Sequence, residues 1–455
     1  MERDFETVPV GRLVWQLGLP AMLAQLFNIL YSIVDRVYIG RMAAGAETAL
    51  ASIGICSPAF TAVTGFASLV GVGGASLMSI SLGERNRERA QQAMNNALLL
   101  LLLFSAVVTG GLLALKRPFL YLLGCSDAMY PAANTYFTIY ALGTPAVLCG
   151  VGLNRFIMGQ GCARQGMLSV VLGALVNLVL DPVFIYGLSL GVAGAALATV
   201  LSQLCVLVYV LAVLNRRSMS IRLGFGQYSA AVCRRILSIG SMPFLIIVLD
   251  NLLIVLLNAM LRSYGGAQGD RYISYAAVVQ SVMVVAICPA EGLTSGCATL
   301  FSYYYGAGSC KRILESFRYV LLYAGLYLDV LTLAIAAFPE LFVRLFLSDP
   351  AAVAQAAVFT RRYCMGFFFV AVQFAFVDGF TAMGMVREAV PISFFRKGLY
   401  VLAVLLLPRL LPLEDIFYAC PLSDCLGALF TIVVYALFLR KRLLRTCRVR
   451  TADQA

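Results

Sequence analysis

Apolar runs about as long as a membrane helix recur along the whole chain, and they constrain its fold more than any other feature. In lipid, a helix satisfies its backbone hydrogen bonds internally, so repeated runs of this length predict a bundle of membrane helices. An all-α polytopic membrane protein with twelve crossings is expected. The expected crossings are 13–39, 49–77, 93–115, 133–157, 168–188, 193–214, 235–261, 272–302, 314–338, 358–383, 390–411 and 416–439.

The composition excludes a soluble domain. Of 455 residues, 61% are hydrophobic and 12% are charged, whereas about a quarter of the residues in soluble proteins are charged. Most of the 34 Lys and Arg residues are predicted to lie on the same side of the membrane as the N-terminus. They include Arg396 and Lys397. This bias predicts a multi-pass protein of the cell (inner) membrane with both termini cytoplasmic. The net charge of +12 is then largely positive-inside bias, and no basic soluble domain remains to bind nucleic acid.

Histidine is absent, and the 13 cysteines form no CxxC pair. The cysteines are therefore expected to be small buried hydrophobes, without disulfides or a metal cofactor. Intramembrane acyl transfer or proteolysis needs a histidine, a Ser–Lys pair or an aspartyl dyad in a fixed motif, and no such motif is found. Neither an enzyme nor a receptor with a soluble partner-binding domain is expected.

The two halves of the chain are similar to each other. The polar segment 215–235 separates six runs from six, which predicts bundles at 1–214 and 236–455, the second ending in a basic cytoplasmic tail. A shift of 223 residues (243 − 20) places Pro20 on Pro243, and each proline is predicted to kink its helix. Because six crossings return the chain to the same side, the repeat is parallel, an arrangement found in transporters.

Acidic residues within apolar runs are the candidate functional groups. A carboxylate at mid-membrane costs roughly 2.5–3.5 kcal/mol on insertion scales, so Asp35 and Asp181 are expected to have a role. Asn177 and Asp181 are four residues apart and share one face of a helix. Pro182 cannot donate to the carbonyl of Leu178, which leaves one more oxygen free. Such oxygens suit Na⁺, and two carboxylates in a low dielectric bind a proton readily, so either ion fits.

Several stretches resemble the multidrug and toxic compound extrusion (MATE) family, and the resemblance covers about residues 11–440. They are LGLPAMLAQLFNILYSIVDRVYIG at 17–40, SLGERNRERAQQAMNNAL at 81–98, FIMGQGCARQGM at 156–167, NLVLDPVFIYGLSLGVAGAALATVLSQ at 177–203 and EGLTSGCATLFSYYYGAGSCKRILESF at 291–317. The resemblance implies two pseudo-symmetric six-helix bundles around a central cavity and drug/cation antiport by alternating access. The resemblance also implies that the first helix bends at Pro20.

Within the family, the chain is most similar to the branch named for DNA-damage-inducible proteins. That resemblance implies a cation site at Asp35, Asn177, Asp181 and Thr199, which would bind Na⁺ through the first three if transport is sodium-coupled. Other interpretations stay open. Asp181 could be a helix-end residue capped by the turn at Gly187, Asp35 could reach the outer surface, and Asn177 and Thr199 could be ordinary interhelical hydrogen-bonding groups.

A substrate cavity is expected to include Asp250, Glu291 and Asp378 of the second half and the apolar residues Phe27 and Met158. The alternative for the acidic residues is pairing with buried arginine or with backbone. Two further local features are structural. The run 71–76 (GVGGAS) predicts close helix packing, and the tyrosines at 303–305 predict an interfacial aromatic belt.

The expected function is secondary antiport: export of amphipathic, often cationic, drugs or metabolites in exchange for Na⁺ or H⁺. The expected partners are the small-molecule substrate and membrane lipids, with the chain acting as a monomer and no cofactor beyond the coupling ion. The alternative is a flippase for lipid-linked oligosaccharides or cell-wall precursors. A flippase would require a basic central cavity and helices beyond twelve, whereas the candidate intramembrane charges here are mainly acidic.

Overall fold

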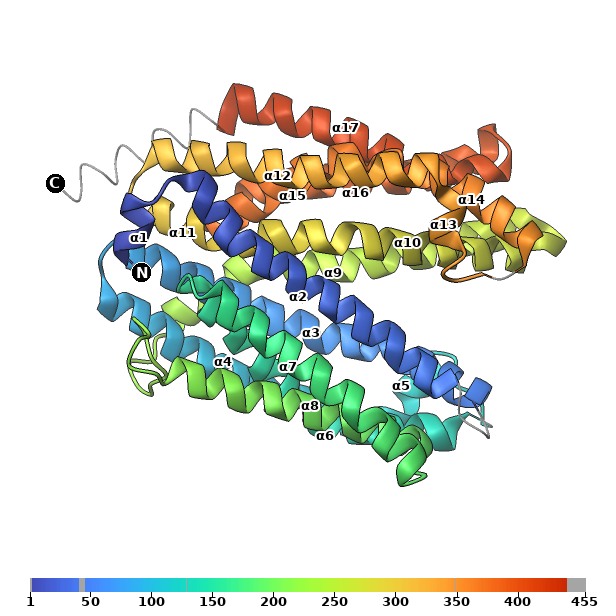
Figure 1. Cartoon of the computed structure of the whole chain (residues 1–455), viewed down its shortest axis with the longest axis horizontal. Helices are drawn as coiled ribbons and strands as arrows, with labels where there is room; N and C mark the ends of the chain where they lie inside the picture. The colour runs from blue at the N-terminus through green and yellow to red at the C-terminus, as the bar shows by residue number, and fades with distance from the viewer. Residues whose placement is uncertain (1, 41–45, 128, 348, 440–455) are drawn as a thin grey trace. The chain divides into compact units, whose positions relative to one another are not determined.

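The fold is built from long helices. The computed structural model describes residues 2–40, 46–127, 129–347 and 349–439, and no strand occurs among them (Figure 1). Eleven helical stretches of this part are long and apolar enough to cross a membrane, judged by length and composition. One further pair of helices, bent by 46° at its junction, makes a twelfth crossing when counted as one span. The all-helical fold class is confirmed; the basic tail from residue 440 lies outside the described residues.

Two compact units divide the chain. Unit 1 is Leu23–Ile247, and unit 2 combines residues 2–22 with those from Val248 onward. The helices α2 (Val10–Gly40) and α9 (Ala230–Gly265) therefore each contribute to both units. Each passes from one unit to the other within five residues after an internal proline, Pro20 in α2 and Pro243 in α9. Both helices continue through the proline, and a kink at either position stays a prediction.

Unit 1 is a bundle in which α6 packs against five other helices, α3, α4, α5, α7 and α8. Its elements besides the parts of α2 and α9 are α3 (Ala46–Gly83), α4 (Arg87–Ala114), α5 (Lys116–Leu122), α6 (Tyr130–Gly159), α7 (Ala163–Pro182), the π-helical turn η1 (Val183–Gly187) and α8 (Gly191–Leu214). Since α6 contacts helices on several sides, most of its side chains are buried.

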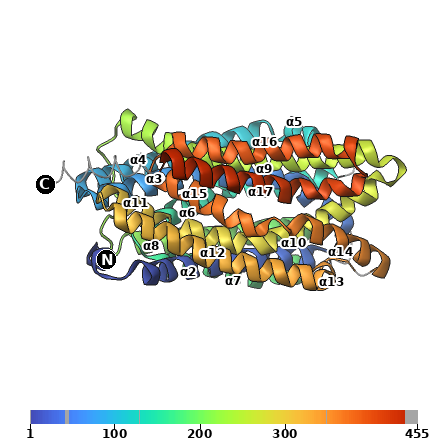
Figure 2. The ribbon, with the colours of Figure 1, turned by 90° about the horizontal axis from the view of Figure 1, so that it is seen from above.

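Unit 2 is organised around α15, which packs against α10, α11, α12, α16 and α17. Figure 2 shows α10, α12, α16 and α17 running nearly parallel. The elements of this unit besides the parts of α2 and α9 are α1 (Glu2–Thr7), η2 (Gly266–Gln268), α10 (Gly269–Gly296), α11 (Ala298–Gly306), α12 (Cys310–Ala337), α13 (Pro339–Val343), α14 (Pro350–Cys364), α15 (Phe367–Ala382), α16 (Val386–Leu410), η3 (Leu413–Tyr418), α17 (Ala419–Val434) and η4 (Tyr435–Leu439). The bent span is the pair α14 and α15.

Glycines allow α3 and the first part of α9 to approach closely within unit 1. A Cβ placed on Gly73 would lie 2.1 Å from the carbonyl oxygen of Ile236, and one on Gly240 would lie 1.6 Å from that of Leu69. Only glycine fits such a backbone-to-backbone contact. The close packing expected for the run 71–76 is therefore present.

The polar connection between α8 and α9 is hydrogen-bonded to amide side chains of other parts of unit 1. Asn96 Nδ2 donates to the carbonyl of Gln227 at 3.1 Å, and Asn96 Oδ1 accepts from the Ser229 amide at 2.8 Å. Gln160, at the end of α6, makes both a donor and an acceptor bond to the backbone of Ile221. These bonds satisfy backbone groups that no helix or strand would pair.

The tyrosines at 303–305 are buried, so the interfacial belt expected there is wrong. They lie at the end of α11, where the amino-terminal segment of unit 2 covers them. The Tyr304 hydroxyl donates to the carbonyl of Phe5 at 3.0 Å, and the Phe5 ring contacts Tyr303 with centroids 4.9 Å apart. The Arg312 guanidinium also donates to the Phe5 carbonyl, so the segment is held by polar as well as aromatic contacts.

Candidate cation site

The end of α7 places an amide and a carboxylate side by side in the interior of unit 1. Asn177 and Asp181 are 2% and 1% exposed, and Asn177 Nδ2 donates to Asp181 Oδ1 at 3.2 Å. The i, i+4 spacing puts both side chains on one helix face, as the sequence predicts. Pro182 ends the α-helical hydrogen bonding, and the π-helical turn η1 follows immediately. Single π-helical turns within membrane or soluble helices are frequent at functional sites.

Asp35 of α2 lies against Asp181. The two carboxyls are within hydrogen-bonding reach, and their charges act on each other. Asp181 Oδ2 is buried and accepts no hydrogen bond from a donor in the described part of the chain. Two carboxylates are acceptors only, so a stable contact between them requires a proton or a metal ion to supply the missing positive charge. This arrangement can therefore hold a cation.

Thr199 of α8 lies close to this pair through a residue that sequence reasoning missed. The Tyr136 hydroxyl of α6 lies near the Thr199 side chain, and Tyr136 is also within electrostatic range of Asp35. Thr199 Oγ1 donates its own proton to the carbonyl of Ala195 at 3.0 Å, so its lone pairs remain available as acceptors. The four sequence-predicted residues are thus gathered in one part of unit 1, with Tyr136 as a link among them.

Tyr31 is the second missed residue. It precedes Asp35 by one helical turn on α2 and lies within electrostatic range of both Asp35 and Asp181. A buried tyrosine hydroxyl normally needs a polar partner, so tyrosines in apolar runs near the aspartates were a usable signal. Their spacing alone does not distinguish them from packing or interface tyrosines, because the contact depends on how α2 and α6 are rotated.

The donor set is made of oxygens from carboxylate, amide and hydroxyl groups. Among the described residues no group of three or more His, Cys, Asp or Glu side chains is arranged to hold a metal ion. An ion here would instead be shared by two carboxylates and neutral oxygens. Such a mixed oxygen set fits a hard, weakly held cation rather than a tightly bound transition metal.

The acidic residues of unit 2 are in three different settings. Asp250 of α9 forms an ion pair with Lys397 of α16. Asp378 of α15 accepts a 2.6 Å hydrogen bond from Thr294 Oγ1. Glu291 of α10 is exposed. For Asp250, pairing with a buried basic residue is observed, although the partner is lysine and not arginine.

Phe27 and Met158, the apolar residues expected to contact substrate, both belong to unit 1. Phe27 is 39% exposed on α2. Met158 of α6 is half-buried and packs toward Gly166 of α7, where a Cβ would lie 2.7 Å from Met158 Cγ. Met158 therefore has a packing contact within the bundle, and the role of both residues toward substrate stays a prediction.

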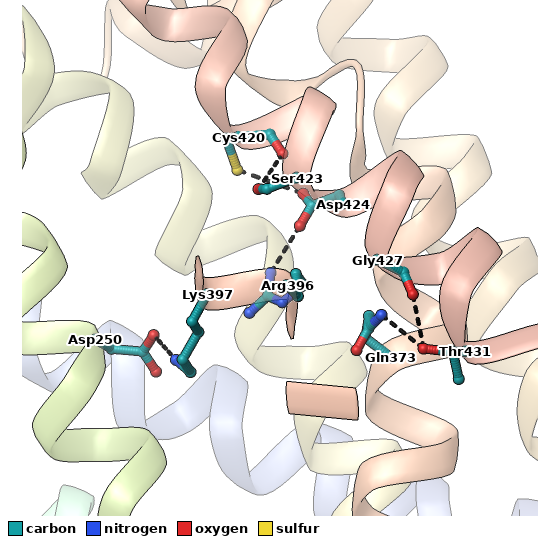
Figure 3. A network of polar contacts seen from close by, with 9 residues as sticks. All are labelled: Asp250, Gln373, Arg396, Lys397, Cys420, Ser423, Asp424, Gly427 and Thr431. Carbon is teal, nitrogen blue, oxygen red and sulfur yellow. Dashed lines mark hydrogen bonds and ion pairs between the residues drawn. The ribbon is translucent and has the colours of Figure 1, made fainter. Parts of the chain in front are cut away.

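Arg396 and Lys397 do not lie at a cytoplasmic helix end, where the positive-inside assignment predicts them. Both lie inside the membrane-spanning stretch Val386–Leu410 and are paired with acidic side chains. Arg396 Nη1 is 2.7 Å from Asp424 Oδ1 of α17, and Figure 3 shows the two pairs as neighbours. The sequence signal was available, since two adjacent basic residues within an apolar run demand buried partners.

Comparisons with known proteins agree with this architecture. The MatE family model matches residues 20–183 and 247–406. The multidrug export protein MepA of Staphylococcus aureus strain N315 is 23% identical over 442 residues, covering 96% of each chain. MepA of Staphylococcus haemolyticus is also 23% identical over 442 residues, covering 95% of each.

Solved structures show the same fold. An outward-facing multidrug resistance MATE family transporter superposes with a TM-score of 0.87 at 19% identity, covering 99% of this chain and 98% of that one. A MATE protein in its bent conformation gives a TM-score of 0.89 at 20% identity, covering 98% of this chain and 99% of that one. The family model spans more than half of the sequence and includes the helices that carry Asp35 and Asp181. The chain therefore belongs to the MatE family of membrane transporters.

Proposed function

We propose that this transporter is a secondary antiporter that exports amphipathic, often cationic, compounds in exchange for Na⁺ or H⁺, with the coupling ion bound at Asp35 and Asp181. The observation that carries the proposal is the contact between these two carboxyls inside unit 1. Two negative charges side by side in an apolar bundle repel each other unless a cation is bound between them. Acidic residues at such positions in membrane proteins typically have a function in ion binding or transport.

The surrounding groups support an exchangeable ion. Asn177 donates to one oxygen of Asp181, while the other oxygen accepts no hydrogen bond from a described donor. Tyr136 adds a hydroxyl oxygen near Asp35, and Thr199 lies near Tyr136. A proton would bridge the carboxyls, and Na⁺ would be coordinated by carboxylate, amide and hydroxyl oxygens. With either ion, no positively charged side chain of the site would have to move away before the ion is released.

Coupling would follow from differential affinity. An ion shifts the equilibrium between two conformations only by as much as it prefers one of them. If the carboxyl pair is closer in the state with low drug affinity, loading of the external ion favours that state and drug release. Loss of the ion to the cytoplasm then restores drug affinity. The names of the MepA relatives, multidrug export proteins, support drug-like compounds as the exported class.

The test is efflux of ethidium from proteoliposomes under a sodium gradient and a pH gradient imposed separately. Asp35→Asn and Asp181→Asn remove one charge of the pair with little change in shape, and each should reduce coupled efflux by about tenfold or more, as for loss of 1.4 kcal/mol or more. Asp329→Asn of α12, another aspartate in a membrane-spanning stretch, is the matched control and should transport normally. Wild-type rates in either variant of the pair would overturn the assignment.

A flippase for pyrophosphate-linked lipids would need unneutralised basic groups at mid-membrane. Here Arg396 and Lys397 are each paired with a carboxylate, which does not favour that alternative. The placement in the branch named for DNA-damage-inducible proteins, the monomeric state and the cytoplasmic location of both termini stay predictions. Reconstitution with the two gradients also decides between Na⁺ and H⁺.

A further inference from the structure

The ion pair between Asp250 and Lys397 is asymmetric in its exposure. The Lys397 side chain is 5% exposed, whereas that of Asp250 is 50% exposed. Figure 3 shows the lysine of α16 extended toward the carboxylate of α9. Asp250 therefore retains a free surface while its charge is compensated from the buried side. Both residues lie within membrane-spanning stretches.

The exposed half of Asp250 must meet water. A carboxylate directed into lipid is costly, and acidic residues at membrane depth face the bundle interior or a water-filled space. A group that meets water there is also reachable by a dissolved cation. Asp250 is thus accessible on one side and already paired on the other.

The neighbouring basic residue is not free to replace Lys397. Arg396 Nη1 is 2.7 Å from Asp424 Oδ1, and Asp424 is fully buried. Asp424 Oδ2 also accepts a 3.4 Å contact from Cys420 Sγ. A Cβ on Gly427 would lie 2.9 Å from Arg396 Cγ, so the arginine stem is packed tightly against α17. Of the two ion pairs, the Arg396–Asp424 pair is therefore the fixed one. In the other pair, the partner of Lys397 is accessible.

A displaced Lys397 has a second carboxylate within reach of its charge. Glu291 of α10 acts electrostatically on the Lys397 ammonium, in the same direction as Asp250 does. An ammonium stranded without a partner in this interior would cost several kcal/mol. With Glu291 nearby, release from Asp250 does not strand it.

We propose that Lys397 is a tethered counter-cation of Asp250, which a cationic substrate must displace to bind that carboxylate. The pair then determines specificity: only a cation that binds Asp250 more favourably than the lysine does is accepted there. Unit 2 carries its own positive charge at its accessible carboxylate, whereas the carboxyl pair of unit 1 depends on an external ion. That the cation bound at Asp250 is the exported compound rests on the proposed function. The competition between Lys397 and an organic cation for Asp250 does not rest on it.

The experiment measures equilibrium binding of tetraphenylphosphonium, a monovalent organic cation, to the purified full-length protein in nanodiscs. Lys397→Met removes the ammonium and keeps the length of the side chain, and its partner Asp250 stays hydrated. It should bind the cation about tenfold tighter than wild type, as for removal of a competitor worth about 1.4 kcal/mol. Lys397→Arg, which keeps the charge, should bind as wild type does. Arg362→Met, which removes a cation paired with Asp415 elsewhere in unit 2, is the matched control.

Double substitution separates a site from a general charge effect. In Lys397→Met/Asp250→Asn both charges are gone, no buried group is stranded, and the tighter binding should disappear. Uncharged triphenylphosphine oxide should bind all variants alike. The inference is overturned if Lys397→Met binds the cation no tighter, or if the gain survives Asp250→Asn. If wild type neither binds nor exports organic cations but Lys397→Met gains binding through Asp250, the proposed substrate class fails and the tethered counter-cation stands.

Discussion

The fixed ion pair of unit 2 offers a quantitative test of how its charges are balanced. Asp424→Asn keeps the size of the side chain but removes its charge, so the Arg396 guanidinium loses its 2.7 Å partner. Asp250 also acts on Arg396, yet it is already bonded to Lys397. The substitution therefore leaves one positive charge uncompensated inside the helix bundle.

The expected loss follows from burial. Breaking one side of a buried ion pair costs about 3–5 kcal/mol. Asp424 is 0% exposed but the Arg396 side chain is 23% exposed, which places the effect near the lower end, about 3 kcal/mol. For a unit of roughly 200 residues, each kcal/mol lowers the unfolding midpoint by about 2–4 °C, so the midpoint should fall by roughly 6–12 °C.

The assay is thermal unfolding of the purified protein, followed by size-exclusion of samples heated to a series of temperatures. The control is the double variant Arg396→Met/Asp424→Asn, in which no charge is stranded. Because replacing a whole buried pair by apolar groups is often nearly neutral, the double variant should recover at least half of the loss. A double variant that unfolds as early as Asp424→Asn would refute the reasoning, since the loss would then come from packing and not from charge.

Two further predictions concern packing and reactivity. Gly240→Ala should destabilise unit 1 by about 1–3 kcal/mol, because its Cβ would meet the Leu69 carbonyl oxygen at 1.6 Å. The matched Gly325→Ala in α12, where no atom lies within 4 Å, should not lower the unfolding midpoint; equal loss in both would contradict the packing argument. Burial raises the pKa of the Cys162 thiol to about 11. Its reactive thiolate is therefore scarce at pH 7.5, and the thiolate fraction increases as the pH rises toward the pKa. Maleimide should therefore label partly exposed Cys310 before Cys162 at pH 7.5, and the reverse order would be inconsistent with a buried thiol.

Much of the architecture was predictable from local sequence alone. Apolar runs long enough to cross a bilayer leave helices as the available structure, because unpaired backbone groups are not tolerated in lipid. The spacing of Asn177 and Asp181 was equally informative, since residues four apart on a helix share a face whatever surrounds them. Pro182 marked the end of regular α-helical bonding, and a π-helical turn follows it. Each of these inferences depends only on neighbours along the chain.

The pairings between helices were decided by the tertiary structure. Whether Asp35 meets Asp181, whether Tyr136 reaches Thr199, and whether Lys397 turns to Asp250 all depend on the rotation and depth of helices far apart in sequence. An apolar run specifies that a helix spans the bilayer but hardly its rotation, because lipid and the bundle interior are both apolar. For this reason the sequence places Arg396 and Lys397 at a cytoplasmic end, whereas in the structure they are paired within unit 2. Their partners come from other helices, and only the packing of those helices brings the charges together.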